Sequence, residues 1–316
     1  MQAAFLQKAS YLAFFALFCA TTAHADTLNN SYYSQGTVRD NYQYANTAPS
    51  TGTAPSSYQW TSSEDTQPDT ALFRFNNTAW VAAGTSFNNY KETVSPIPDS
   101  ERGWLPSVAG GVDYMTNSNL YLSVDASGAF GNEHYNGAVY DSNTNTYDIP
   151  YQTRTNETVA TVDGKVGQGF YVSNRVMLIP YGDLGFRYWD RDLGQGQDEK
   201  YQTMMALGGL MLEIAPTDRL VLSGYASGGT TFFNRMTTSG NAYQLGSAGV
   251  EKVGAKIGYD LTRKVELFTT LDYGHFHNGR SQNNTEIINN VEYISDEPGS
   301  RTSDTTMRVG LGYHFR

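Results

Sequence analysis

The chain has 316 residues, a formal net charge of -10 and a mean hydropathy of -0.47. This acidic balance argues against nucleic acid, or anionic lipid recognised by net charge alone, as a partner. The only cysteine is Cys19, so the rest of the chain has no disulfide framework and no cysteine metal site.

Residues 1–25 have the pattern of a secretory signal peptide. Lys8 provides the positive charge, residues 11–18 form a short apolar core, and Ala23 and Ala25 fit the small-residue cleavage pattern. A membrane-spanning helix needs about 20 apolar residues, and this core is much shorter. We therefore expect export with cleavage after Ala25.

Residues 26–70 are rich in Ser, Thr, Asn, Tyr and Pro and have almost no aliphatic side chains. Such a segment cannot bury enough apolar surface to offset the entropy lost on ordering. We predict a flexible periplasmic lead-in, with a binding motif in its Tyr/Gln stretch as the alternative. The folded domain is then 71–316.

From Leu72 onward apolar residues recur at every second position, which is typical of β-strands. In segment 253–261 one face is apolar, and the other mixes glycine with Lys256 and Asp260; segment 305–316 repeats the pattern. A soluble sandwich would bury the apolar face, whereas a membrane barrel turns it to lipid and its polar face to a lumen.

The connections between these segments alternate between short turns and long polar loops. The long loops are 94–102, 141–155, 193–200, 237–247 and 279–301. Short turns on the periplasmic side and long loops outside are typical of an up-and-down membrane barrel, which needs an even number of strands to close. We predict an all-β, antiparallel transmembrane barrel of about ten strands, with eight to twelve left open. The expected spans are 73–90, 103–116, 120–139, 155–173, 176–192, 200–215, 220–236, 248–262, 265–278 and 302–315.

Aromatic residues cluster near both ends of the predicted strands, as expected for girdles at the two membrane interfaces. Near the short turns lie Tyr114, Tyr121, Phe170, Tyr171, Tyr259, Tyr313 and Phe315. Near the long loops lie Trp104, Phe130, Tyr188, Trp189, Tyr201, Phe232, Tyr273 and Phe276. A soluble sandwich would place its large aromatic residues in mid-strand.

The last strand, Val309-Gly-Leu-Gly-Tyr-His-Phe315, looks like the terminal signal of Gram-negative outer-membrane barrels, although Arg316 follows the final aromatic residue. Over residues 70–316 the pattern resembles the small outer-membrane β-barrel families, in particular opacity-like barrels and autotransporter β-domains. This resemblance implies an outer-membrane location, contact with its lipid and insertion by the barrel-assembly machinery. Residues 26–70 are too short to be an autotransporter passenger.

The polar face of the predicted strands supplies the lumen with seven acidic and five basic residues. They are Asp113, Asp125, Asp163, Lys165, Asp183, Arg187, Glu213, Lys252, Lys256, Glu266, Asp272 and Arg308. A narrow barrel has little interior beyond its own side chains, and unpaired buried charges are costly. We expect these charges to pair across the lumen, with a narrow small-solute channel as the alternative.

No catalytic, cofactor or metal site is predicted. Asp190 and Asp192 share a face, as in omptin-type proteases, but Asp272 and His275 lie on opposite faces, so the partner pair of that family is missing. His275 and His277 share a face without an evident third ligand.

The long loops are therefore the expected carriers of function, because recognition usually lies in loops on a rigid scaffold. Possible contact residues are Tyr140, Tyr147, Tyr151 and Tyr293. The predicted function is non-enzymatic: envelope structure or adhesion to a surface ligand. The alternatives are a porin-like channel and, less favoured, an omptin-like hydrolase.

Overall fold

The computed structural model describes residues 70–93, 99–141, 146–194, 198–238, 240–288 and 291–316. The predicted signal peptide, with Ala23 and Ala25, and nearly all of the lead-in lie outside these residues. Contacts divide the chain into Met1–Thr66 and Gln67–Arg316, and every described residue belongs to the second unit. Among the described residues no helix is long and apolar enough to cross a membrane.

One short helix and a series of strands make up this unit. They are α2 (Ala71–Phe75), β1 (Thr78–Glu92), β2 (Ser100–Met115), β3 (Leu120–Asp141), β4 (Thr146–Gln168), β5 (Phe170–Ser173), β6 (Val176–Asp192), β7 (Asp198–Ile214), β8 (Leu220–Thr238), β9 (Asn241–Gly246), β10 (Gly249–Asp260), β11 (Val265–Ser281), β12 (Asn284–Ile288), β13 (Val291–Ser295) and β14 (Ser300–His314).

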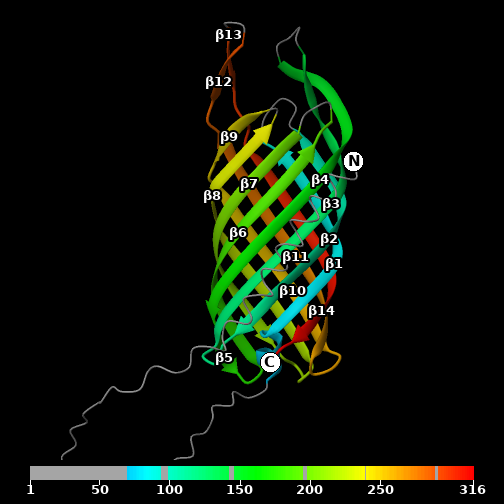
Figure 1. The fold of residues 1–316 in the computed structure, drawn as a ribbon, viewed down its shortest axis with the longest axis vertical. Coiled ribbons are helices and arrows are strands. Elements are labelled where there is room, and N and C mark those ends of the chain that lie inside the picture. Colours follow the sequence, from blue (N-terminus) through cyan, green and yellow to red (C-terminus); the bar gives the residue numbers. More distant parts are fainter. Residues whose placement is uncertain (1–69, 94–98, 142–145, 195–197, 239, 289–290) are drawn as a thin grey trace, which may run out of the picture. The chain divides into compact units, whose positions relative to one another are not determined.

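The strands form a closed antiparallel ring (Figure 1). Within the described residues, twelve strands belong to one sheet. Eleven of them follow the order β10-β11-β14-β1-β2-β3-β4-β6-β7-β8-β9, β5 pairs with β6 off this path, and a pairing of β8 with β10 closes the ring. β5 and β9 are short additions, and the other ten strands are the wall. The ring seals where β1 meets β14, from Thr78 opposite His314 to Glu92 opposite Ser300. The predicted fold class and ten-stranded wall are confirmed.

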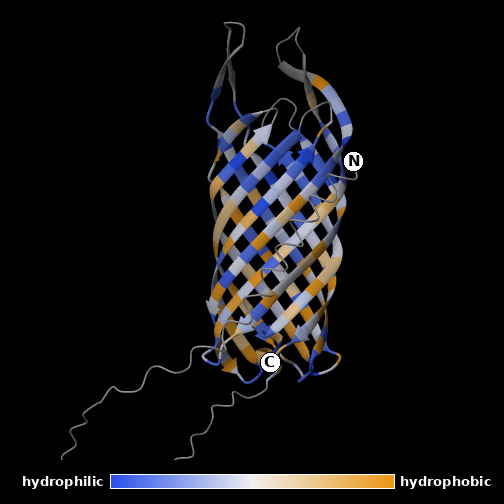
Figure 2. Ribbon diagram, viewed as in Figure 1, coloured by the Kyte–Doolittle hydropathy of each residue, from blue (hydrophilic) through white to orange (hydrophobic). Residues whose placement is uncertain are grey.

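The wall is apolar on the outside and polar on the inside. On β14, Val309 and Leu311 are 57% and 52% exposed, while the intervening Gly310 is buried. Figure 2 shows apolar residues along the middle and turn-side parts of the wall and hydrophilic ones toward the loops. A soluble sandwich would bury these Val and Leu side chains, so this sidedness favours a wall that faces hydrocarbon.

The first predicted strand begins too early, because residues 71–75 are helical. Thr70 caps α2, its Oγ1 accepting a hydrogen bond 3.2 Å long from the Phe73 backbone N–H. All five helical residues are buried, and the four apolar ones pack in one cluster with side chains of β2, β6 and β8, including Met115, Met177 and Val221. Because these strands lie on different sides of the ring, α2 fills the turn-side end of the lumen.

Three predicted loops contain strands. β9 lies in the predicted loop 237–247, where it pairs with the end of β8, and the other two loops hold longer paired structures. β4 begins at Thr146 and pairs with β3 as far as Asp141, and residues 284–295 form the separate hairpin β12–β13. Both regions project beyond the wall on the loop side (Figure 1). Apolar alternation cannot reveal strands there, because outside the membrane both faces of a strand meet water. Pro150 is tolerated in β4 because β6 pairs with β4 only from Asn156 onward, which leaves Pro150 on an open edge.

Four of the predicted interface aromatics point into the barrel, and their assignment to the girdles was wrong. Tyr121, Trp189, Tyr201 and Phe276 are all buried. Position along a strand does not set the face, and each of these residues lies on the inward face of its strand. The other girdle residues are exposed or half-buried on the outside; Trp104, Phe232 and Tyr313, for example, are 63%, 52% and 54% exposed.

The buried position of α2 leads to a stability prediction. Leu72 is 0% exposed at the centre of the turn-side cluster, so Leu72→Ala should lower the free energy of unfolding by about 3 kcal/mol through the cavity it leaves. Leu261→Ala is the matched control, because Leu261 is 50% exposed in a turn. Urea unfolding of the refolded barrel in detergent measures both, and equal losses would contradict the packing of α2.

Candidate functional site

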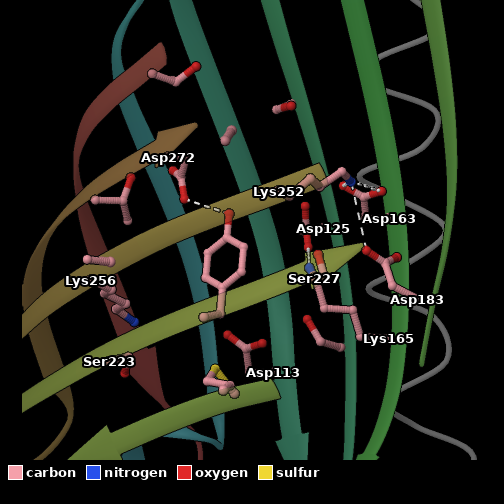
Figure 3. Close-up of a pocket in the computed structure, with 18 of the residues that line it drawn as sticks. Asp113, Asp125, Asp163, Lys165, Asp183, Ser223, Ser227, Lys252, Lys256 and Asp272 are labelled. Carbon is pink, nitrogen blue, oxygen red and sulfur yellow. Dashed lines mark hydrogen bonds and ion pairs between the residues drawn. The ribbon is translucent and has the colours of Figure 1, made fainter. Parts of the chain in front are cut away.

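The middle of the lumen holds a polar cavity of about 280 Å³ (Figure 3). Ten of the twelve predicted lumen residues line it: Asp113, Asp125, Asp163, Lys165, Asp183, Glu213, Lys252, Lys256, Asp272 and Arg308. The other two contact this lining or its neighbours. Arg187 forms an ion pair 3.1 Å long with Asp304, and Glu266 lies 2.8 Å from the Lys256 ammonium.

Ion pairs join strands on opposite sides of the barrel. Lys252 of β10 lies 2.8 Å from Asp163 of β4 and 3.8 Å from Asp183 of β6. Arg187 of β6 reaches Asp304 of β14 across the full width of the ring. Such contacts are possible only in a narrow lumen, where side chains from opposite walls meet.

The remaining lumen charges are also held by neighbours. Lys165 forms an ion pair with Asp125, and Arg308 lies 3.7 Å from Asp272. Asp113 accepts hydrogen bonds from Trp80 Nε1 and Tyr121 Oη. Glu213 accepts hydrogen bonds from Asn76 Nδ2 and Ser223 Oγ, which ties the end of α2 to β7.

A buried polar network closes the turn-side end. Asp260 of β10 contacts Arg74 of α2 at 3.1 Å and His314 Nε2 at 2.8 Å. The other ring nitrogen of His314 lies 2.6 Å from Thr78 Oγ1. A Thr–His–Asp chain of this kind can serve nucleophilic catalysis, but Thr78 and His314 are both 0% exposed. With no path for a substrate, the network instead fastens α2 to the seam between β1 and β14.

The loop-side end is closed around Arg191. Its guanidinium lies 2.8 Å from Glu101 and 2.7 Å from Glu199. The rings of Tyr90, Trp189 and Tyr201 surround it at 4.3, 5.0 and 6.0 Å from their centroids. Since Tyr90 belongs to β1 and Trp189 to β6, their contact at 5.2 Å crosses the lumen and blocks it.

Carboxylates outnumber cations in this loop-side cluster, which lies beyond the aromatic band. Tyr90, Tyr135 and Tyr201 donate hydrogen bonds to Glu92, Asp99 and Glu297 at 3.2, 2.6 and 2.9 Å. Burial raises the pKa of Glu92 to about 7 and that of Glu297 to about 8, and neighbouring carboxylates add to both shifts. Burial also raises the pKa values of Asp99 and Glu199. Glu92 and Glu297 therefore retain protons near neutral pH.

The residues weighed for catalysis do not converge. Asp272 is inside the barrel, 2.9 Å from Tyr225 Oη, whereas His275 stacks on Tyr273 on the outer face. Asp190 accepts a hydrogen bond from Tyr188, and Asp192 bonds the Gly194 backbone N–H at the exposed rim. The rings of His275 and His277 lie 4.5 Å apart, and the described residues contain no group of three side chains placed to hold a metal ion.

Among the predicted loop contacts, Tyr151 lies on β4 with its ring 6.1 Å from that of Tyr135. The side chains of Tyr140, Tyr147 and Tyr293 lie outside the described residues.

Sequence reasoning missed the Arg191 cluster and the Asp260–His314 network. A signal for Arg191 was available, because Arg187, Trp189 and Arg191 alternate on one face and Arg187 was already assigned to the lumen. No sequence signal pairs Asp260 with His314, since the strands that carry them are not neighbours in the sheet.

Comparison with known proteins identifies a fold. No family model and no curated protein matches the sequence. The outer membrane protease OmpT from Escherichia coli has a similar structure, with a TM-score of 0.54 and 12% identity over 75% of this chain and 96% of that one. The translocator domain of the autotransporter NalP from Neisseria meningitidis matches with a TM-score of 0.34 and 14% identity, over 75% and 88%. Neisserial surface protein A matches with 0.30 and 11%, over 75% and 97%.

The likeness to OmpT, together with the closed ring and its apolar outer face, defines the class. This chain has the fold of a Gram-negative outer-membrane β-barrel, as its strand pattern predicted. At 12% identity the likeness covers the fold and not the activity.

We expect Arg191 to be essential for the stability of the loop-side end of the barrel. Arg191→Met leaves the buried Glu101 and the half-buried Glu199 without a cation and should cost about 3–5 kcal/mol of stability. Adding Glu101→Gln to that variant should recover part of the loss, as measured by thermal unfolding in detergent. A double variant no more stable than Arg191→Met would show that the pair is not coupled.

The raised carboxyl pKa values predict a pH dependence. Protons bind more tightly to Glu92 and Glu297 in the folded barrel than in the unfolded chain, whose ordinary glutamate value is 4.5. The stabilisation that comes from this tighter proton binding is therefore complete below about pH 4.5 and is lost as pH rises to about 8. The melting temperature should fall across this window, and Glu92→Gln combined with Glu297→Gln should flatten the fall. An unchanged slope in the double variant would assign the dependence to other groups.

Proposed function

We propose that this protein is a non-enzymatic outer-membrane barrel that supports a surface-exposed, interacting loop face. The observation that carries this proposal is that, in the part of the chain that the structure describes, paired β-structure extends beyond the wall on the loop side, in the β3–β4 extension and in the β12–β13 hairpin. Ordered hairpins on a rigid barrel are a suitable platform for contact with a surface partner.

The filled lumen favours a role as a scaffold rather than as a pore. The α2 cluster occupies one end and the Arg191 cluster the other, and both are built from side chains of strands on opposite sides of the ring. Charged residues between them are paired across the lumen. A permeating ion would have to displace buried ion pairs, which is costly.

The positions of the candidate acid–base groups support a non-enzymatic role. The His–carboxylate pair formed by His314 and Asp260 is buried at the turn-side end, where 0% of His314 is exposed. General acid–base catalysis needs groups within reach of a substrate.

A narrow channel is the second candidate, and the central polar cavity of about 280 Å³ favours it. In that case α2 would be a plug that leaves the lumen. Removing residues 71–76 would then open a path from the turn side to the cavity.

Conductance in planar bilayers separates the two candidates. The scaffold predicts no steady current for the purified full chain, and ohmic steps would contradict it. In the chain lacking residues 71–76, steady current would support the plug, whereas the closed Arg191 cluster predicts no current even without α2. Leu261→Ala is a control that leaves α2 in place.

The interaction itself is tested by replacing residues 284–295 with a short Gly-Ser linker. We expect the barrel to assemble normally, because this hairpin is a separate two-stranded sheet, while attachment of expressing cells to a panel of coated surfaces falls several-fold. A linker of equal length in place of the turn 262–264 is the control. If attachment does not depend on the hairpin, the hairpin is not the contact surface.

Cysteine labelling tests the orientation, because no cysteine follows Cys19. Gln152 is exposed on the β4 extension, so Gln152→Cys should react with an impermeant reagent on intact cells. Ser118 is exposed in a turn at the opposite end of the barrel, so Ser118→Cys should not react. The reverse labelling would show that the barrel has the opposite orientation in the membrane.

A further inference from the structure

A series of basic side chains runs around one half of the outer wall, just beyond the loop-side aromatic residues. We call it the basic belt: Lys91 of β1, Arg102 of β2, His134 of β3, Arg154 of β4, His277 of β11 and Arg301 of β14. These residues are far apart in sequence. The alternation of each strand turns all of them outward, because their inward neighbours, such as Tyr90, Glu101 and Glu133, are buried.

Strand register makes the belt continuous. His277 stands opposite Arg301, and Arg301 stands opposite Lys91. On the other side, Arg102 stands opposite His134, which stands opposite Arg154. Lys91 and Arg102 are linked diagonally, since Arg102 pairs with Asn89, two residues before Lys91. Neighbouring strands are about 4.8 Å apart, so adjacent members lie within reach of a single phosphorylated head group.

The lysine and arginine side chains of the belt are exposed and lack anionic partners. Lys91, Arg102, Arg154 and Arg301 are all exposed, and none forms an ion pair with any residue in the part of the chain that the structure describes. In the lumen the pattern differs, since the cations Lys165, Arg187, Lys252, Lys256 and Arg308 are each paired with carboxylates. The belt is therefore a set of cations left available for an external anion.

The belt lies at the depth of the lipid head groups. Outward aromatic residues mark the edge of the hydrocarbon just below it: Trp104 is 63% exposed two residues from Arg102, Phe130 is 47% exposed four residues from His134, and Tyr273 is 42% exposed four residues from His277. At about 3.3 Å per residue these spacings place the belt about 7–13 Å beyond the aromatic band along the strands, which is a smaller height along the membrane normal because barrel strands tilt.

Charge is distributed unevenly around the circumference at this height. The opposite half, at the loop ends of β6 and β7, carries the exposed acids Asp192 and Asp198, and Asp198 is paired with Lys200 at 3.7 Å. Glu251 on β10 stands opposite His275 and ends the belt on that side. A merely solvated rim would mix both signs, as this opposite half does.

We propose that the basic belt binds the phosphate groups of phosphorylated lipids in the outer leaflet. Arginine forms bidentate hydrogen bonds with phosphate, and lysine provides a point charge. This inference adds a lipid site to the proposed scaffold function, but it does not depend on the loops having a partner. The net charge of -10 does not oppose it, because binding depends on the local field within about 10 Å.

Lipid binding by the purified full-length mature chain tests the proposal. The probes are bis-phosphorylated lipid A, the same lipid without phosphates, and inorganic phosphate, each titrated in neutral detergent and followed by native mass spectrometry. Arg102→Gln combined with Arg154→Gln should weaken binding of phosphorylated lipid A by about thirtyfold, given about 1 kcal/mol per basic residue near an anionic lipid. Arg219→Gln combined with Lys264→Gln removes the same charge from exposed turn-side positions and should leave binding unchanged.

Each outcome decides the proposal. Preference for phosphorylated lipid A, lost in the belt variant, retained in the turn-side variant and weakened by salt, supports it. Equal binding of the dephosphorylated lipid, or equal losses in both double variants, overturns it. Saturation of the belt by inorganic phosphate at the same concentration would assign it to soluble anions and overturn the lipid site. Because all substitutions are at exposed positions, heat-modified gel mobility should show folded barrels throughout.

Discussion

Hydrocarbon cannot hydrogen-bond to a peptide group, and the rest of this structure depends on that constraint. A sheet in lipid must pair every backbone donor and acceptor, so it closes on itself. The pairing of β1 with β14 and of β8 with β10 completes the ring. Closure leaves each strand with one face toward lipid and one toward a narrow interior, and the sequence alternation follows from it.

The narrow interior explains the lumen. Charged residues that would be solvated on a soluble protein meet across the barrel, as Lys252 and Asp163 do, and each is stable only with its partner. The same crowding lets a helix of one turn and a cluster around one arginine close the two ends. The interior is therefore closed at both ends by packed side chains, with paired charges around the cavity between them.

The sequence predicted those features that repeat along the chain. Strand positions in the wall agree within a few residues, except at the start, because a two-residue period is imposed wherever lipid and lumen face each other. It did not predict α2 or the β4 extension, where that constraint is absent. Nor did it separate Trp189, which is buried, from Tyr188 beside it, because an aromatic residue near a strand end suits both faces.

The arrangement of charged residues on the outer wall could not be predicted from the overall charge of the chain. The basic belt gathers Lys91, Arg154 and Arg301 from three distant segments, and only the strand register brings them into one row. Composition suggested the opposite, but many acids of the described residues are buried inside the barrel, as Asp163, Asp183 and Glu266 are. Net charge is thus a poor guide to the outside of a barrel whose two faces are segregated.

The position of α2 has a consequence for assembly. The helix immediately precedes β1 in the chain, yet its contacts come from β2, β6, β8, β10 and β14. Its binding site is therefore complete only when the last strand has docked against the first. A half-built barrel cannot hold the helix, and a finished one leaves it no entrance between the strands. Enclosure of the helix and sealing of the seam should accordingly be a single cooperative event, with His314 joining only at the end.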